Sequence, residues 1–261
     1  MDPVSTTRRW IHALKDEAAR LLAGRRGLSR TVNGMTFRVH PDTRARFAGA
    51  YDPGAGRALA ERVRPGQEVW NVGANVGVYV LQLGELVGPS GHVVAFEPAP
   101  AAADLLWRNV VLNGFTDRVT LIRAAVGEEQ GETQFFVDGA SPMGRAGQAN
   151  PLLERTAAVR VPAVTLDQVA LDRGRMPDAI VMDIEGFEVG ALRAATSILT
   201  GKGSVRPWLI VELHPDAWSW SGHNRDQLQQ VIEAAHLRVV PLSGQRDPLG
   251  EYGQVLIEPT A

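Results

Sequence analysis

A glycine-rich turn places the tightest constraint on how this 261-residue chain can fold. The sequence NVGANVG occupies residues 71–77, between a short apolar strand predicted at 69–72 and a helix predicted at 76–86. Glycines at such a junction let the backbone turn sharply and let a ligand approach the main chain. The helix that follows offers unpaired N–H groups in its first turn. The turn therefore predicts a ligand site at the carboxyl end of a strand.

Strands and helices alternate after this turn. Further strands are predicted at 92–96, 119–125, 179–184 and 208–213, helices at 101–112, 189–199 and 225–235, and a closing pair of strands at 238–242 and 254–257. Strands that alternate with helices of about 10–15 residues form βαβ units around a mostly parallel sheet. The sequence thus predicts an α/β fold, whose ligands bind at the carboxyl ends of the strands.

An N-terminal appendage is predicted ahead of this alternation. A capped amphipathic helix at 5–23 and a hairpin at 32–39 around Asn33-Gly34 make up residues 1–50. The main domain then spans 51–261. The amphipathic helix leaves a homodimer open as the oligomeric state.

The middle of the chain is irregular. Segments 133–137 and 158–161 are predicted as extra strands that pair with each other, and 138–155 as a loop rich in Gly, Ser, Pro and Asn. Long loops in compact domains are commonly functional, so this loop is a candidate lid over the ligand site.

The composition excludes several classes of protein. Lys and Arg number 27 against 29 Asp and Glu, for a formal net charge of −2. A chain near neutrality lacks the positive field that holds nucleic acid, so no nucleic-acid partner is expected. The absence of cysteine rules out disulfides, thiolate nucleophiles and cysteine-ligated zinc. No stretch of about 18 apolar residues is present for a membrane span, and we expect a cytoplasmic protein without a membrane partner.

A carboxylate follows the second strand at an informative distance. Glu97 comes twenty residues after Gly77, where an acidic side chain can accept hydrogen bonds from both hydroxyls of a ribose. Strand, turn, helix, strand and acid thus appear in the order typical of a site for an adenosine-containing ligand.

The glycine spacing favours S-adenosylmethionine (SAM) over NAD. Dinucleotide sites use G-x-G-x-x-G, whose second glycine lets the backbone approach a pyrophosphate. Here Gly73 and Gly77 flank Ala74 and Asn75, and that second glycine is missing. SAM carries no phosphate. None of the three tyrosines has Lys four residues further on, which also argues against an NAD-dependent oxidoreductase.

Seven short strings, in order along the chain, make it resemble the FkbM family of SAM-dependent methyltransferases. They are NVGANVG at 71–77, AFEPAP at 95–100, NVVLN at 109–113, AVG at 125–127, VTLD at 164–167, MDIEGFE at 182–188 and VELH at 211–214. The resemblance covers roughly residues 50–240. It implies a Rossmann-like class I methyltransferase sheet of seven mostly parallel strands with the last antiparallel. It also implies methyl transfer to a hydroxyl of a small molecule, such as a sugar or natural product.

The resemblance also implies which residues hold SAM. The predicted cofactor-binding residues are Asn71, Gly73, Asn75, Gly77, Glu97, Ala125 and Asp183. Two positions depart from the family pattern, because Asn71 stands where Asp is usual and Val181 where Lys is usual. Asn71 carries no charge, so an anionic partner for the cofactor is lost there.

Four titratable side chains follow two neighbouring strands. Asp183 and Glu185 end one predicted strand, and Glu212 and His214 stand in the same relation on the next. Residues two apart on a strand share a face, so all four could point at a substrate if the strands continue that far. They are the predicted catalytic residues: Asp183 positions SAM, and Glu185, Glu212 or His214 binds or deprotonates the acceptor.

His214 is the preferred general base, because the ordinary pKa of imidazole lies near 6.5. The same four groups suit Mg²⁺ or Mn²⁺, but no metal is predicted. Glu188 is interpreted as structural, since a carboxylate in the first turn of a helix complements the helix dipole. Trp218 and Trp220 are candidates for contact with the acceptor.

Alternatives remain open at this point. The same fold serves N- or C-methylation of a small molecule. A non-catalytic SAM-binding protein also remains open, because of Asn71 and Val181.

Overall fold

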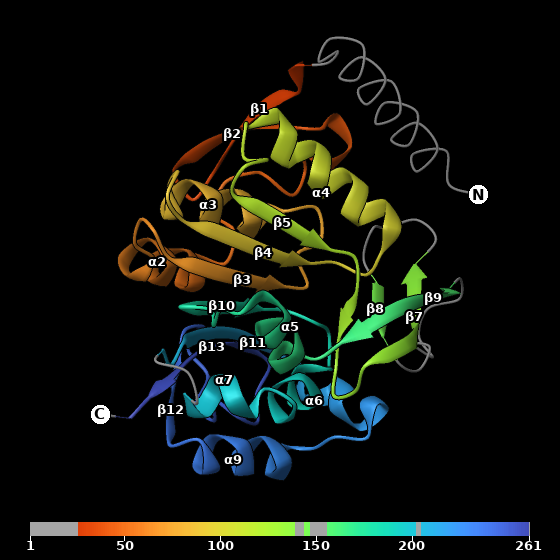
Figure 1. Ribbon diagram of the computed structural model, residues 1–261, viewed down its shortest axis with the longest axis vertical. Helices are drawn as coiled ribbons and strands as arrows, with labels where there is room; N and C mark the ends of the chain where they lie inside the picture. Colours follow the sequence, from red (N-terminus) through yellow and green to blue (C-terminus); the bar gives the residue numbers. More distant parts are fainter. Residues whose placement is uncertain (1–25, 139–143, 147–155, 202–204, 261) are drawn as a thin grey trace, which may run out of the picture.

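The computed structural model describes residues 26–138, 144–146, 156–201 and 205–260. Its centre is a seven-stranded sheet (Figure 1). In spatial order the strands are β12 (Leu237–Pro241), β13 (Gly253–Pro259), β11 (Trp208–Leu213), β10 (Ala179–Met182), β3 (Glu68–Val72), β4 (His92–Phe96) and β5 (Val119–Ile122). β13 runs antiparallel to β11 and β12, and the other pairs are parallel. The predicted sheet, with its antiparallel last strand, is confirmed.

Helices cover both faces of this sheet (Figure 1). One face carries α2 (Pro53–Arg62), α3 (Val78–Val87) and α4 (Pro100–Leu112), and the other α5 (Leu166–Arg173), α6 (Glu188–Arg193), α7 (Thr196–Thr200) and α9 (Arg225–Ala234). Successive strand residues point to opposite faces. In β3, Val69 therefore joins one hydrophobic core and Trp70 the other. Burial on both faces explains why the strands are almost continuously apolar.

The predicted hairpin is present as β1 (Leu28–Val32) and β2 (Met35–Val39). Asn33 and Gly34 both have positive φ, of 47° and 79°, as a two-residue turn of type I′ requires. Phe37 is buried in the same core as α4, so the hairpin packs on the main domain. The predicted helix at 5–23 lies outside the described residues, and the division into 1–50 and 51–261 stays a prediction.

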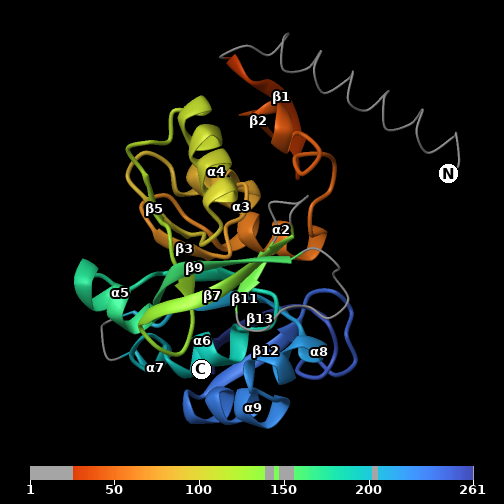
Figure 2. The ribbon, with the colours of Figure 1, turned by 90° about the vertical axis from the view of Figure 1, so that its right-hand side faces the viewer.

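A second, smaller sheet lies at the carboxyl ends of the central strands. Its order is β6 (Ala125–Val126), β9 (Thr156–Val164), β7 (Gly131–Asp138) and β8 (Gly144–Ala146). Figure 2 faces this side and shows β7 and β9 running across it. The predicted pairing of the two extra strands is confirmed as β7 with β9. β8 falls inside the predicted loop 138–155, whose segments 139–143 and 147–155 lie outside the described residues, as does most of the candidate lid.

Several predicted elements end earlier or divide. The strand expected at 119–125 is β5 plus β6, which belong to different sheets, and the strand expected at 179–184 stops at Met182. The helix expected at 189–199 is α6 followed by α7. Asp167 explains the second start, because its carboxylate accepts hydrogen bonds from the N–H groups of Ser197 and Ile198 at 2.7 and 3.0 Å.

Helices α2 and α5 were not predicted, nor were α8 (Pro215–Trp218) and the short 3₁₀ helices η2 (Pro41–Thr43) and η3 (Ser219–Ser221). Within the described ranges, no helix combines the length and the apolar character needed to cross a membrane.

Candidate active site

The glycine-rich turn follows β3 and lies in close contact with the chain at the end of β10. Gly73 has φ of 81°, and a Cβ at this position would lie 1.8 Å from the carbonyl oxygen of Asp183. Asn75 also has positive φ, of 47°, and its side-chain oxygen accepts a hydrogen bond from the N–H of Val76 at 2.8 Å. The turn is therefore built around main-chain contacts that a side chain at 73 would prevent.

Glu97 is held against this turn. Its carboxylate is 5% exposed and accepts hydrogen bonds from the N–H groups of Asn75 at 2.7 Å and Ala99 at 2.8 Å. Burial raises the pKa of Glu97 to about 7, although the two hydrogen bonds act to lower it. The carboxyl group therefore titrates near neutral pH.

A pocket opens between the turn, the end of β4 and the small sheet. It contains about 580 Å³ of space between atoms, part of which is open solvent. Five of the seven predicted cofactor residues line it: Gly73, Asn75, Glu97, Ala125 and Asp183. Apolar walls come from Phe96 on β4 and Phe135 on β7.

The other two predicted cofactor residues do not line this pocket. Asn71 is 1% exposed, and its side-chain nitrogen donates to the carbonyl of Val181 on the neighbouring strand at 3.3 Å. Gly77 precedes α3, and a Cβ there would meet Leu106 on α4 at 3.2 Å. Residue 71 is part of the sheet interior, and the glycine at 77 allows two helices to approach each other.

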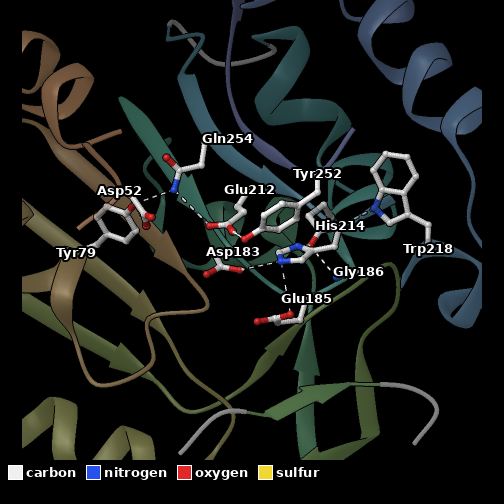
Figure 3. Close-up of polar contacts among 11 residues, drawn as sticks. Asp52, Tyr79, Asp183, Glu185, Gly186, Glu212, His214, Trp218, Tyr252 and Gln254 are labelled. Carbon is white, nitrogen blue, oxygen red and sulfur yellow. Dashed lines mark hydrogen bonds and ion pairs between the residues drawn. The ribbon is translucent and has the colours of Figure 1, made fainter. Parts of the chain in front are cut away.

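Asp183, Glu185 and His214 converge at the rim of the pocket (Figure 3). Nε2 of His214 lies 3.9 Å from Oδ1 of Asp183 and 3.5 Å from Oε2 of Glu185. The condition for strand alternation to align the two carboxylates is not met, since β10 ends at Met182. Glu185 instead has φ of 54°, and this left-handed turn brings its carboxylate beside the ring.

Glu188 orients His214 from behind. Its carboxylate is fully buried and accepts hydrogen bonds from Nδ1 of His214 at 3.0 Å, the N–H of Gly186 at 2.7 Å and Nε1 of Trp218 at 2.8 Å. The interpretation of Glu188 as a helix-dipole residue therefore missed its positioning role. Trp218 is buried, so it supports Glu188 and presents no open face to an acceptor. Trp220 is half-buried on η3.

The charges around His214 change the proton affinities of the site. Burial by itself lowers the pKa of His214, but the hydrogen bond to Glu188 and the charges of Glu188, Glu185 and Asp183 outweigh it and raise the pKa to about 9. Burial and the charges of Glu212 and Glu185 raise the pKa of Asp183 well above its ordinary value. His214 is therefore a cation at neutral pH, and the reason for choosing it as a base, an ordinary pKa near 6.5, does not hold.

Glu212 belongs to a separate polar chain beside the cluster (Figure 3). It accepts hydrogen bonds from the hydroxyl of Tyr252 and from Nε2 of Gln254, the latter at 3.3 Å. Gln254 also donates to the hydroxyl of Tyr79 at 3.3 Å, and Tyr79 donates to Asp52 at 2.8 Å. Sequence reasoning missed Asp52, Tyr79, Tyr252 and Gln254. The register that sets Gln254 opposite Glu212 comes from the antiparallel β13, which no local motif specifies.

A mostly parallel sheet with a glycine turn, a carboxylate after β4 and a polar cluster after β10 defines a Rossmann-like class I methyltransferase. The chain belongs to the FkbM methyltransferase family, since the profile described as "Methyltransferase FkbM domain" matches residues 71–237.

Other known proteins resemble parts of the chain. A protein-L-isoaspartate O-methyltransferase from Hyperthermus butylicus is 37% identical over 67 residues, which are 23% of this chain and 28% of that protein. The chain thus matches little more than a quarter of this relative's length.

Two solved structures are similar to this chain over most of its length. A SAM-dependent methyltransferase from Aquifex aeolicus is 16% identical, with 77% of this chain and 86% of that one covered and a TM-score of 0.41. Precorrin-6y C5,15-methyltransferase from Geobacter metallireducens is 14% identical, with 78% and 85% covered and a TM-score of 0.44.

Proposed function

We propose that this protein transfers the methyl group of SAM to a hydroxyl of a small molecule, a sugar or a natural product, in the cytoplasm. The observation that carries the proposal is that the same two carboxylates border both the pocket and the cluster around His214. Asp183 and Glu185 line the pocket and also face His214. Groups that can accept a proton thus stand beside the space where the cofactor would lie.

The residues around the pocket suit SAM. Glu97 offers a carboxylate for the ribose hydroxyls, Gly73 leaves its main chain open to close approach, and Ala125 and Phe135 supply apolar surface for the adenine. Asp183 would face the methionine part. When bound, SAM supplies an electrophilic methyl group and leaves as S-adenosylhomocysteine.

The acceptor side of the reaction falls to the cluster. A hydroxyl acceptor must be held in line with the methyl carbon and must lose its proton as the new carbon–oxygen bond forms and the carbon–sulfur bond breaks. The Asp183 carboxylate, whose pKa is raised by burial and by neighbouring carboxylates, takes that proton. The His214 cation keeps enough of Asp183 ionised to do so. Glu212 and Tyr252 would contact the acceptor. We propose a small molecule as the acceptor, and no nucleic acid or membrane as a partner.

Ligand titration tests the cofactor assignment. We expect calorimetric titration to give one site for SAM or S-adenosylhomocysteine and no heat of binding for NAD. A panel of hydroxyl and amine acceptors with methyl-labelled SAM then tests the reaction. Labelled ethers support O-methylation. Labelled amines or carbon-methylated products would show N- or C-methylation in place of O-methylation. SAM binding without any methylated product would support a non-catalytic SAM-binding protein.

The affinity for S-adenosylhomocysteine should depend on pH through Glu97. Only the ionised carboxylate accepts hydrogen bonds from both ribose hydroxyls, and its pKa is about 7. The ionised form is lost as pH falls through 7, so the affinity should fall by up to about tenfold per pH unit below that point. Calorimetry from pH 5.5 to 8.5 measures this. Glu97→Gln should bind S-adenosylhomocysteine more weakly at pH 8 and should lose the pH dependence of affinity that wild type shows. If the variant kept the same pH dependence, Glu97 would not contact the ribose.

A further inference from the structure

The cluster at the pocket rim has the donor set of a cation site. One oxygen each from Asp183 and Glu185 and one ring nitrogen of His214 lie within 4.8 Å of one another. The measured separations of 3.5 and 3.9 Å from Nε2 exceed the length of an ordinary hydrogen bond. These three side chains thus surround a common space, in which His214 forms ion pairs with both carboxylates and no short hydrogen bond.

One oxygen of this cluster makes no hydrogen bond. Oδ1 of Asp183 is buried and makes no hydrogen bond to the described residues, although the side chain as a whole is 30% exposed. A buried carboxylate oxygen without a hydrogen-bond donor is costly, and the ion pair with Nε2 of His214 at 3.9 Å is too long to replace the hydrogen bonds to water that it has lost. The oxygen is aimed at His214, so a positive ion between them would satisfy it (Figure 3).

His214 is held in the orientation that metal-binding histidines commonly have. The buried carboxylate of Glu188 accepts the hydrogen of Nδ1, which fixes the ring and turns Nε2 toward the two carboxylates. A carboxylate behind a histidine in this way fixes the tautomer and strengthens the other nitrogen as a ligand. Glu188 is itself fixed by Gly186 and Trp218, so the orientation does not depend on a ligand.

The geometry points to a divalent cation bound by Asp183, Glu185 and His214, with Mn²⁺ or Mg²⁺ as the fitting class. Two carboxylates and one imidazole suit such ions, whose bonds of about 2.0–2.2 Å set neighbouring donors about 3 Å apart. The two separations from Nε2 exceed that spacing by less than about an ångström. Glu185 is 41% exposed, so an ion from solvent can reach the cluster.

Such a cation would also serve the proposed reaction. A hydroxyl bound to a divalent cation loses its proton more readily, and the ion would take over the positive charge that the protonated ring supplies without it. This consequence rests on the proposed function. The binding of the ion does not.

Manganese binding to the full-length chain tests the site directly. The protein is freed of metal with a chelator, and free Mn²⁺ is followed by electron paramagnetic resonance, without SAM or acceptor. We expect one Mn²⁺ per chain, displaced by excess Mg²⁺. Glu185→Gln should weaken binding at least tenfold and, being at the exposed rim, should keep the fold, which circular dichroism checks. Glu188→Gln should weaken binding about tenfold through the ring orientation.

A matched control and a separate readout make the result decisive. Glu61→Gln removes an exposed carboxylate on α2, outside the cluster, and should bind Mn²⁺ as wild type does. No saturable binding, or a Glu185→Gln variant that binds Mn²⁺ like wild type, would overturn the site. Binding of S-adenosylhomocysteine is measured in the same samples. If the protein binds Mn²⁺ but not S-adenosylhomocysteine, the cation site stands and the proposed function is rejected. If it transfers methyl groups but does not bind Mn²⁺, the proposed function stands and the cation site is rejected.

Discussion

Replacing His214 with alanine should leave the affinity for S-adenosylhomocysteine within about twofold of wild type and reduce turnover by about 10²- to 10⁴-fold, the size of a general acid–base contribution. His214 does not line the cofactor pocket, so ligand binding should survive. The ring supplies positive charge beside Asp183 and Glu185. Without it the pKa of Asp183 rises further, and the protonated carboxyl group cannot take the acceptor's proton.

The pH profile distinguishes this role from a structural one. The loss of charge should move the rising limb of the kcat profile to higher pH, so His214→Ala should recover part of its activity in alkaline buffer. Initial rates between pH 6 and 10 measure this shift.

The matched control is His92→Ala, at the amino end of β4, where the imidazole forms a hydrogen bond with the hydroxyl of Thr120. That variant should keep wild-type turnover. Equal turnover for both variants would remove His214 from the mechanism.

The strands of the fold were predictable because their runs are apolar and bounded by turn residues. β4 and β11 begin and end where the sequence predicted. The hairpin at Asn33-Gly34 was equally local, because few residues other than Asn and Gly accept positive φ at both turn positions. Patterns confined to one segment were therefore sufficient to locate these elements.

The site was only partly predictable, because its geometry depends on contacts across the chain. The sequence places Asp183, Glu185 and His214 near one edge, but it does not show that Glu185 turns left-handed. Nor does it show that Glu188 reaches His214, twenty-six positions away, in place of capping a helix. A buried carboxylate in a first turn has the same local pattern as an exposed one.

Tertiary hydrogen bonds also decided where elements stop. The predicted helix at 189–199 divides because Asp167, from α5, caps a new helix start at Ser197. Asn71 was expected at the cofactor because of the family resemblance, yet its side chain bonds to Val181 inside the sheet. In each case the partner lies on a distant segment, which periodicity and spacing do not reveal.

Gly73→Ala should be the most damaging single substitution in the turn. The residue has φ of 81°, and its added Cβ would lie 1.8 Å from the carbonyl oxygen of Asp183, which is main chain and cannot rotate away. We expect the free energy of unfolding to fall by about 4 kcal/mol or more, in the range of severe backbone and packing defects. Binding of S-adenosylhomocysteine should be lost, because relief of the clash moves β10 away from β3 at the floor of the pocket.

Gly114→Ala separates the steric cause from the conformational one. Gly114 also has positive φ, of 70°, but a Cβ there meets nothing within 4 Å. Its substitution should cost only the left-handed backbone conformation, about 1–2 kcal/mol, and leave ligand binding intact. Urea unfolding of both variants measures the difference. If the two agreed within about 1 kcal/mol, positive φ alone would explain Gly73, and the close approach of the turn to Asp183 would not be what requires a glycine.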